Sequence, residues 1–392
     1  MATVRTGLER LLTDEIHRVR GRRIGLVAHP ASVTSKLRHA VDALRDVGAA
    51  PSVLFGPEHG LGGEAQDMEG VAAGDTTGRA GHVPTYSLYG DSFASLSPDP
   101  AWLDGLDAVV VDLQDVGSRY YTFVWTAVLV ARACAAKGVE TIVCDRPNPL
   151  GGAVTEGAPQ REDERSFVGL RCVPVRHGLT VGELVRDAAR AEGIAGVTVV
   201  PMEGWRREML WEDTGLPWVL PSPNMPTPDT AAVYPGGCLL EGTNLSEGRG
   251  TTRPFEVFGA PWADGRGLAD ALARHAGDGC AARVMTFRPT FQKHAGVTCR
   301  GVQVHLTDRR RFQPYRAYLA MIAAARGMEG FRWRTERYEF VDDRPAIDLL
   351  TGDGDVRRAI DAGADFDAVM AVGRERMDAW RATERERWIY QP

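Results

Sequence analysis

Two residues suited to acid–base chemistry, Glu58 and His59, stand side by side in residues 55–64, FGPEHGLGGE. The run at residues 51–54 before them is typical of a buried strand, and three glycines after them allow the backbone to turn tightly. In an open α/β sheet, ligands bind at the loops that follow the carboxyl ends of the strands. We therefore interpret Glu58 and His59 as candidate catalytic groups. The alternative is a solvated turn whose glutamate caps the next helix.

The composition is that of an ordinary globular protein, because 44% of the 392 residues are hydrophobic and 25% are charged. This length allows two or three domains. The net charge of −6 argues against a nucleic-acid binder, which usually carries a basic stripe. No apolar run is long enough to span a membrane, and residues 1–21 lack the apolar core of a secretory signal. We therefore expect a cytoplasmic protein that binds neither nucleic acid nor a membrane.

The six cysteines show no CxxC spacing, so the sequence predicts neither a zinc knuckle nor a redox pair. Cys134 and Cys144 lie in apolar helix and strand patterns. Both are expected to be buried free thiols.

Alternating helix and strand patterns over the first half of the chain predict a parallel sheet with helices on its faces. Strands are predicted at residues 23–28, 52–55, 83–88, 107–113, 141–144 and 197–202. Helices are predicted at residues 6–19, 37–47, 122–137 and 180–191, the last with Thr180 as its N-cap and Glu183 completing a capping box. Residues 62–81 are glycine-rich and predicted to be irregular.

The first βα turn has no GxGxxG and the chain has no GxxxxGK(S/T), so we expect neither a dinucleotide nor a nucleoside triphosphate as ligand.

Polar clusters follow two further strands of the predicted sheet. The first cluster holds Asp115, Arg119, Tyr120 and Tyr121, and the second holds Asp145, Arg146 and Asn148. Because the carboxyl ends of parallel strands share one edge of a sheet, we expect these clusters to lie near Glu58 and His59.

Two later segments complete the expected site. Residues 217–235 contain many prolines and predict an extended wall that presents Trp218 and Asn224. Residues 241–252, EGTNLSEGRGTT, pack many hydrogen-bonding side chains around glycine turns, which suits a sugar site. The relevant side chains are Glu241, Asn244, Glu247 and Arg249. The alternative for this second segment is a surface loop.

The remainder, from about residue 264, predicts a smaller α+β domain. It begins with a helix at residues 267–275 and continues through a strand-rich region at residues 284–303. The fold class is therefore α/β, with a Rossmann-like parallel-sheet domain and a smaller C-terminal domain.

Five motifs occur here in the order seen in one family: GPEHG at 56–60, GSRYYT at 117–122, DRPNPL at 145–150, SPNMP at 222–226 and EGTNLSEGRGT at 241–251. The sequence resembles the NamZ-type exo-β-N-acetylmuramidases, glycoside hydrolase family 171, formerly the domain of unknown function DUF1343. The resemblance covers nearly the whole chain. It implies a Rossmann-like catalytic domain, residues 1–260, and an auxiliary domain, residues 261–392, with the active site in the cleft between them.

The resemblance also implies a reaction: release of N-acetylmuramic acid from the non-reducing end of MurNAc-GlcNAc fragments during cell-wall recycling. The family's proposed catalytic glutamate falls on Glu58. Many secreted relatives carry a signal peptide and this sequence shows none, which favours processing of imported fragments inside the cell.

Glycoside cleavage needs an acid for the leaving oxygen and a group that stabilises positive charge at the anomeric carbon. Glu58 is the expected acid, and His59 is expected to contact the substrate or to orient the turn. The sequence does not identify the group that stabilises the anomeric carbon. This group is either the 2-acetamido group of the substrate, oriented by a polar side chain, or an enzyme carboxylate. The candidates for either task are Asp115, Glu241 and Glu247.

The lactyl carboxylate of the sugar calls for a fork-shaped arginine. Arg119, Arg146 and Arg249 are candidates, and Arg249 is favoured because glycines flank it. Internal salt bridges are the alternative role for each arginine. Tyr120 or Tyr121 is expected to stack on a sugar face, and the remaining expected substrate contacts are Asn148, Asn224 and Asn244. This scheme needs no metal and no cofactor.

A non-catalytic sugar-binding protein is the main alternative to the glycosidase function. An esterase or amidase is disfavoured because no GxSxG precedes a helix.

Overall fold

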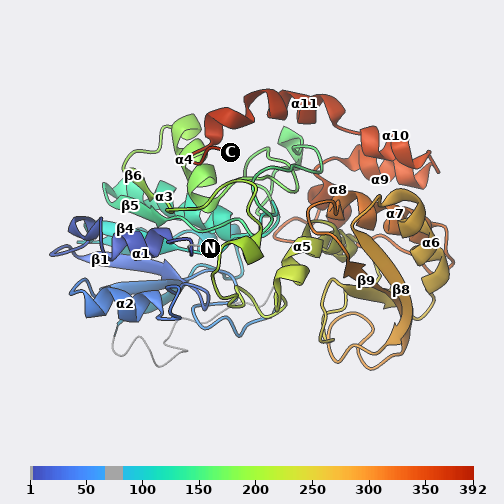
Figure 1. Cartoon of the computed structure of the whole chain (residues 1–392), viewed down its shortest axis with the longest axis horizontal. Helices are drawn as coiled ribbons and strands as arrows, with labels where there is room; N and C mark the ends of the chain where they lie inside the picture. The colour runs from blue at the N-terminus through green and yellow to red at the C-terminus, as the bar shows by residue number, and fades with distance from the viewer. Residues whose placement is uncertain (1–2, 67–82) are drawn as a thin grey trace.

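The chain forms two parts, each built on its own sheet, in a computed structural model that describes residues 3–66 and 83–392. The N-terminal part lies at the left of Figure 1 and the C-terminal part at the right. Most of the stretch predicted to be irregular, residues 62–81, lies outside the described residues.

A six-stranded parallel sheet forms the N-terminal part, in the order β3-β2-β1-β4-β5-β6. The strands are β1 (Ile24–Ala28), β2 (Val53–Gly56), β3 (Thr85–Ser87), β4 (Ala108–Asp112), β5 (Glu140–Cys144) and β6 (Val197–Val200). The predicted α/β fold is confirmed, because this order is that of a Rossmann-like doubly wound sheet. Strand order reverses between β1 and β4, and in such sheets ligands bind at this switch point beyond the carboxyl ends.

Helices cover both faces of the sheet because side chains alternate along each strand. On one face, Leu26 and Leu54 pack with α1 (Gly7–Leu11) and α2 (Ala40–Asp46). On the other, Val27 and Val111 pack with α3 (Phe123–Lys137) and α4 (Val181–Glu192). Cys134 and Cys144 are buried free thiols, as predicted.

Two predicted helix boundaries can be compared directly with the structure. The capping box of Thr180 and Glu183 at the start of α4 is confirmed in both directions. The helix predicted at residues 6–19 is wrong in extent, since α1 ends at Leu11 and a separate 3-10 helix, η1 (Ile16–Arg18), follows. Leu8 and Leu11 of α1 are buried in the core and Ile16 of η1 packs against it partly buried, and periodicity alone does not distinguish these two pieces from one continuous helix.

The C-terminal part holds a three-stranded antiparallel sheet in the order β7-β9-β8. Its strands are β7 (Val257–Ala260), β8 (Cys280–Phe287) and β9 (Cys299–Leu306). Helix α6 (Gly265–His275) packs against β8 and β9, and α7 (Pro314–Arg326) packs against α6 and α5. The smaller α+β unit is thus present, and its first strand occupies residues 257–260. One apolar cluster runs without a break from α3 into α7, so the two parts share a core.

The proline-rich stretch is only partly extended. Residues 228–235 belong to α5 (Pro228–Gly237), which corrects the prediction of an extended wall over residues 217–235. The hydroxyl of Thr227 accepts a hydrogen bond from the Thr230 N–H, and Pro228 occupies the first helical turn. Proline is well suited to that position, because its missing N–H has no partner there in any helix.

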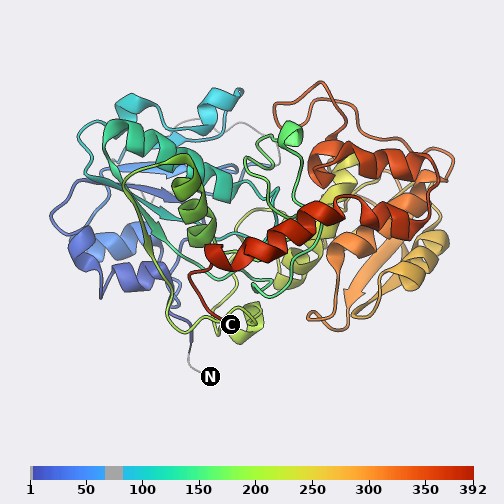
Figure 2. The same ribbon diagram turned by 90° about the horizontal axis from the view of Figure 1, so that it is seen from above.

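The end of the chain returns to the N-terminal part, as Figure 2 shows for the red helix α11. The helices of this segment are α8 (Ala346–Thr351), α9 (Gly354–Asp361), α10 (Phe366–Ala371) and α11 (Arg374–Thr383). The Tyr390 hydroxyl donates to Asp145 Oδ2 at 2.6 Å, and Arg186 of α4 donates to the carbonyl of Trp388 at 3.0 Å. The last residues therefore tie the second part to the first.

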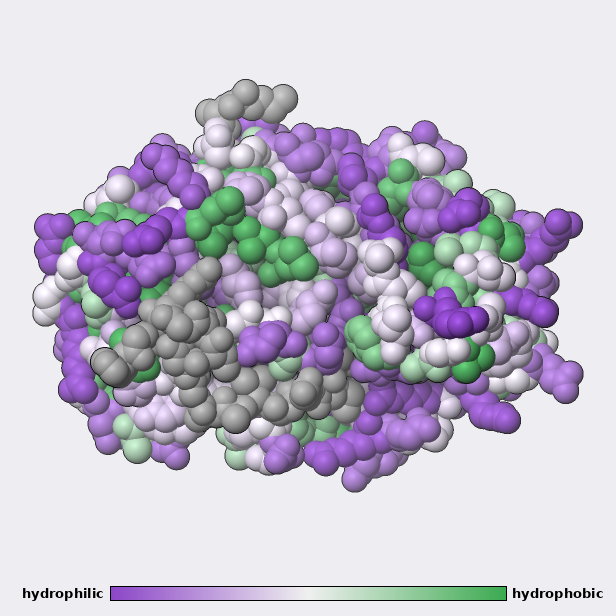
Figure 3. Space-filling view, turned by 90° about the horizontal axis from the view of Figure 1, so that it is seen from below, coloured by the Kyte–Doolittle hydropathy of each residue, from purple (hydrophilic) through white to green (hydrophobic). Residues whose placement is uncertain are grey.

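The remaining regular elements are 3-10 helices: η2 (Phe93–Leu96), η3 (Pro100–Leu103), η4 (Glu162–Glu164), η5 (Trp211–Asp213), η6 (Cys238–Gly242) and η7 (Glu384–Arg387). In Figure 3, polar residues cover most of the face in view, and apolar residues form separate patches. Within the described residues, no helix combines the length and the apolar character needed to cross a bilayer.

Candidate active site

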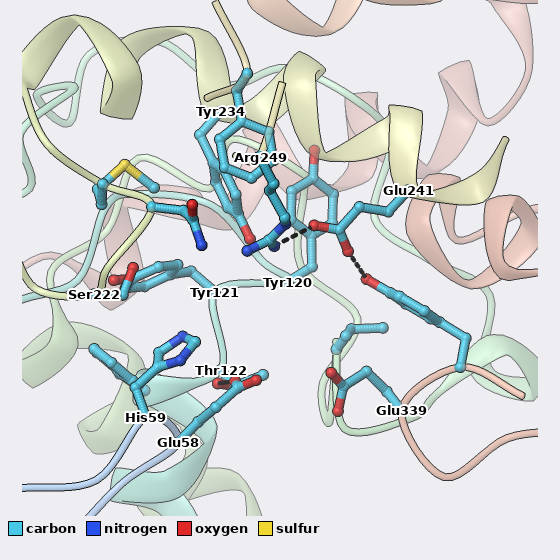
Figure 4. Close-up of a pocket in the computed structure, with 16 residues that line it drawn as sticks. Glu58, His59, Tyr120, Tyr121, Thr122, Ser222, Tyr234, Glu241, Arg249 and Glu339 are labelled. Carbon is cyan, nitrogen blue, oxygen red and sulfur yellow. Dashed lines mark hydrogen bonds and ion pairs between the residues drawn. The ribbon is translucent and has the colours of Figure 1, made fainter. Parts of the chain in front are cut away.

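A polar pocket of about 450 Å³, counting the part open to solvent, lies where the loops after β2 and β4 meet the C-terminal part. Figure 4 shows the side chains that line it. They are Glu58, His59, Tyr120, Tyr121, Thr122, Phe123, Val168, Ser222, Asn224, Met225, Tyr234, Glu241, Arg249, Phe255, Tyr338 and Glu339.

Glu58 reaches the pocket from a tight turn directly after β2. A Cβ on Gly56 would lie 2.5 Å from the backbone nitrogen of Leu61, so only glycine lets the chain fold back here. Glu58 is 6% exposed, and Thr122 Oγ1 donates to its Oε2 at 2.6 Å. Thr122 stands immediately before α3. The turn after β2 and the start of α3 therefore fix the carboxylate together.

His59 occupies a left-handed backbone conformation, with φ of 69°. Its Nδ1 lies 2.8 Å from the carbonyl oxygen of Ala65, and its ring meets Phe123 edge-on. A carbonyl only accepts, so Nδ1 carries a proton in this contact. The non-glycine residue at positive φ is a local strain of the kind that gathers at functional sites.

Arg249 occupies the side of the pocket formed by the C-terminal part. Its Nη2 donates to Glu241 Oε1 at 2.7 Å, and its Nε lies 3.4 Å from Glu247 Oε1. The Tyr338 hydroxyl donates to Glu241 Oε2 at 2.8 Å, and Lys293 Nζ donates to Glu247 Oε2 at 3.0 Å. Burial raises the pKa of Glu247, but the charges of Lys293 and Arg249 outweigh it, so the net pKa is lowered. Two carboxylates and two cations thus form a network that reaches the pocket through Glu241 and Arg249.

Glycines give Arg249 its place in this network. Gly248 and Gly250 have φ of 81° and 79°, in the left-handed region. A Cβ on Gly248 would lie 2.0 Å from the carbonyl oxygen of Val257. Only glycine at position 248 therefore lets the backbone lie this close to Val257.

Aromatic rings form the apolar part of the wall. The rings of Tyr121 and Tyr234 meet edge-on with centroids 5.6 Å apart, and the Tyr234 ring meets Phe255 in the same way. Burial raises the pKa of Tyr121 and of Tyr234 well above the usual value. Both hydroxyls therefore keep their protons. The Tyr120 hydroxyl donates to the carbonyl of Pro235 in α5.

Several residues predicted for the site lie in this pocket. They are Glu58, His59, Tyr120, Tyr121, Asn224, Glu241 and Arg249. Asn224, within the proline-rich stretch, donates to Gln66 Oε1 at 2.9 Å.

Two arginines predicted for the site, Arg119 and Arg146, do not line this pocket. Arg119 is fully buried and donates to the carbonyls of Val173, Leu349 and Leu350. Burial lowers its pKa to about 10. Arg146 forms a two-pronged salt bridge with Asp112 at the end of β4, at 2.6 and 2.7 Å. The alternative role, an internal salt bridge, is found for Arg146, whereas backbone carbonyls bind Arg119.

Other predicted residues also lie outside the pocket. Asp115 is 3% exposed, accepts from the Gly117 N–H at 2.6 Å and faces His177 Nε2 at 3.5 Å. Asn148 donates to the carbonyl of Leu179, and Asn244 donates to the carbonyl of Gly330. These three side chains hold loop backbones in this structure. Glu247 lies behind Arg249 and not on the pocket wall.

Sequence reasoning missed several pocket residues: Thr122, Ser222, Tyr234, Tyr338 and Glu339. Thr122 and Ser222 belong to motifs already singled out, so their place in the motif was an available signal. Tyr338 and Glu339 have no pattern around them that marks a site.

His29, directly after β1, was also missed by sequence reasoning. It does not line the pocket but holds two segments next to it. Burial lowers its pKa well below the usual value, so the ring is neutral. Its Nε2 accepts from the Gln114 N–H at 2.8 Å, and its Nδ1 faces the carbonyl of Pro221 at 3.2 Å. It thereby joins the end of β4 to the segment that carries Ser222 and Asn224.

The fold and the pocket define a Rossmann-like α/β protein whose site, at the carboxyl edge of the sheet, combines carboxylates, an arginine and aromatic rings. Sequence models of exo-β-N-acetylmuramidase NamZ match residues 24–229, for its N-terminal part, and residues 232–390, for its C-terminal part. The chain belongs to the NamZ family, and the resemblance seen in the motifs is confirmed.

Individual relatives agree with this assignment. Peptidoglycan β-N-acetylmuramidase NamZ of Bacillus subtilis (strain 168) is 39% identical over 391 residues, which is 99% of this chain and 91% of that protein. A crystal structure of a DUF1343 family protein from Bacteroides fragilis NCTC 9343 matches with a TM-score of 0.85 and 30% identity over all of both chains. A second DUF1343 structure from the same organism matches with a TM-score of 0.77 and 26% identity, over 100% of this chain and 99% of that one.

Proposed function

We propose that this protein is an exo-acting β-N-acetylmuramidase that releases N-acetylmuramic acid from the non-reducing end of peptidoglycan fragments such as MurNAc-GlcNAc. The observation that carries the proposal is that Glu58, the glutamate of the GPEHG motif, lines one pocket together with Arg249 of the EGRG motif. Membership of the NamZ family supports it. We assign the enzyme to cell-wall recycling in the cytoplasm.

We propose that the active site lies in a cleft between a catalytic and an auxiliary domain. The pocket draws Glu58 and Tyr121 from loops of the parallel sheet and draws Arg249 and Glu339 from beyond residue 240. A glycan that enters the pocket therefore touches both parts of the chain.

Glu58 is the proposed general acid. It gives a proton to the glycosidic oxygen while the bond from that oxygen to the anomeric carbon breaks. The hydroxyl of Thr122 holds the carboxyl group in place, and apolar neighbours such as Phe123 limit access of water. General acid catalysis of this kind contributes about 10²–10⁴-fold in rate.

Arg249 is the proposed partner of the lactyl carboxylate, which distinguishes N-acetylmuramic acid from N-acetylglucosamine. Its guanidinium lies at the pocket wall, and Glu241 and Glu247 hold it from behind. Arginine suits this task because its fork matches a carboxylate. Tyr121 and Tyr234 provide flat apolar surface for the sugar ring.

The test uses purified protein with a chromogenic β-N-acetylmuramide and the matching β-N-acetylglucosaminide. We expect the wild type to release chromophore from the muramide and hardly any from the glucosaminide. Glu58→Gln, which keeps the side-chain size, should lower release by about 10²-fold or more. Glu336→Gln, at an exposed glutamate that does not line the pocket, serves as the control. Binding of muramyl disaccharide by the wild type without any release would instead identify a sugar-binding protein.

A further inference from the structure

Residues 338–341 form a two-residue hairpin turn that projects a third carboxylate into the pocket. The Tyr338 N–H donates to the Val341 carbonyl at 2.8 Å, and the Val341 N–H donates to the Tyr338 carbonyl at 2.9 Å. The two central residues, Glu339 and Phe340, have φ of 44° and 69°. Turns with two successive left-handed residues strongly favour asparagine, aspartate and glycine, and this turn has none of them. Such strain persists only where the surroundings enforce it, and it gathers at functional sites.

Both parts of the molecule enforce this turn. Tyr89, which follows β3, donates its hydroxyl to Glu339 at 3.2 Å from Oε2 and 3.4 Å from Oε1. The Phe340 ring packs edge-on against Tyr89 and against Phe167. On the other side, Tyr338 donates to Glu241. The carboxylate of Glu339 is therefore presented to the pocket in a defined position, and the residue is 4% exposed.

Three carboxylates line the pocket among the described residues: Glu58, Glu241 and Glu339. Figure 4 shows Glu58 and Glu339 in the lower half of the view, while Glu241 above them accepts from Arg249 and Tyr338. One oxygen of Glu241 accepts from Arg249 and the other from Tyr338, so this carboxylate serves to position them. Asp115 and Glu247, the other candidates from the sequence, lie outside the pocket lining.

We propose that Glu339 is the second carboxylate of the reaction, the group that accepts a proton while Glu58 donates one. The inference rests on the proposed glycosidase function. As the bond between the anomeric carbon and the leaving oxygen breaks, its electron pair stays on the oxygen, which takes the proton of Glu58. The nucleophile that bonds to the anomeric carbon, a water or the acetamido oxygen of the sugar itself, becomes neutral by losing a proton from its O–H or N–H. Glu339 accepts that proton.

The test compares Glu58→Gln, Glu339→Gln and the exposed control Glu336→Gln on two aryl muramides. One carries a nitrophenolate leaving group of ordinary acidity and the other a dinitrophenolate, which leaves without help from an acid. We expect Glu339→Gln to lose at least a hundred-fold in kcat on both substrates. Glu58→Gln should recover much of its rate on the dinitrophenyl substrate. The wild-type pH profile should lose its acidic limb in Glu339→Gln, because no base remains to be protonated.

A second variant keeps the test decisive if Glu339→Gln folds poorly. Tyr89→Phe removes only the hydroxyl that orients Glu339, and we expect a lower kcat with a nearly unchanged KM. Wild-type rates on both substrates for Glu339→Gln, or recovery on the dinitrophenyl substrate equal to that of Glu58→Gln, would overturn the assignment. These results leave the proposed function intact, whereas an inactive wild type would overturn the function itself.

Discussion

The hydroxyl of Thr122 donates a hydrogen bond to Glu58 Oε2, with the two oxygens 2.6 Å apart. The two residues are 64 positions apart in sequence, on the loops after β4 and β2. These loops lie on either side of β1 in the sheet order, next to the switch point. The contact therefore links the position of the proposed acid to the geometry of the sheet itself.

Loss of this hydroxyl should slow the reaction without unfolding the protein. Thr122→Val keeps the side-chain shape and removes the donor, so Glu58 is held less firmly. We expect kcat on the chromogenic muramide to fall by about ten-fold or more, as for loss of a hydrogen bond to a charged group. Thr122→Ser, which keeps the hydroxyl, should stay close to wild type. Equal rates for Val and Ser would show that the hydroxyl has no part in catalysis.

Arg249→Met should destabilise the fold strongly as well as abolish recognition of the muramide. The substitution leaves Glu241 and Glu247 buried with one cation fewer. We expect the free energy of unfolding, measured in urea, to fall by about 3–5 kcal/mol. The control is Arg132→Met, which breaks a half-exposed pair with Glu192 and should change stability little. A loss at Arg249 no larger than at Arg132 would contradict the structural role of the network.

Asp145 should make part of the stability depend on pH. Burial raises its pKa to about 6, although Tyr390, Thr180 and the Gly182 N–H oppose the shift. The folded state binds the proton of the Asp145 carboxyl group more tightly than the unfolded chain does. The protonated carboxyl group therefore makes its full contribution to the free energy of unfolding below about pH 4. It is lost as the pH rises through about 6, by on the order of 3 kcal/mol.

The measurement for Asp145 is urea unfolding of the wild type and Asp145→Asn between pH 4 and pH 7. Asparagine does not titrate, so other groups cancel in the difference between the two proteins. The stability of the wild type relative to the variant should decrease as the pH rises. A difference that stays constant over this range, or that increases, would contradict the raised pKa.

Leu37→Gly should stabilise the protein. Leu37 is 58% exposed and has φ of 60°, a conformation that costs a side chain with a Cβ energy. Glycine removes that cost but makes the unfolded chain more flexible, so we expect a net gain of about 0.5–1 kcal/mol. The same change at the neighbouring exposed Lys36, which does not have positive φ, should destabilise instead. Thermal unfolding of the two variants gives the comparison, and a lower Tm for Leu37→Gly would refute the argument.

Local patterns in the sequence predicted the framework of this protein. The apolar run at Ala108–Asp112, the periodicity of α3 and the capping box at Thr180 depend on neighbours within a few residues, which the sequence shows directly. The order of the motifs was sufficient to predict the family. The loops after β2 and β4 were expected at one edge of the sheet because parallel strands require it.

The tertiary structure decided which polar residues face the pocket. Arg119 and Arg146 carry the same group as Arg249, but carbonyls of α8 and the carboxylate of Asp112 take them as partners. Glu339 reaches the pocket from beyond residue 330 because Tyr89 and Tyr338 enforce a strained turn that its own sequence does not favour. Periodicity and spacing describe the local chain, whereas the partner of a buried charge is set by contacts between segments far apart in sequence. That is why the sequence determined the fold and the family, and only folding determined the composition of the site.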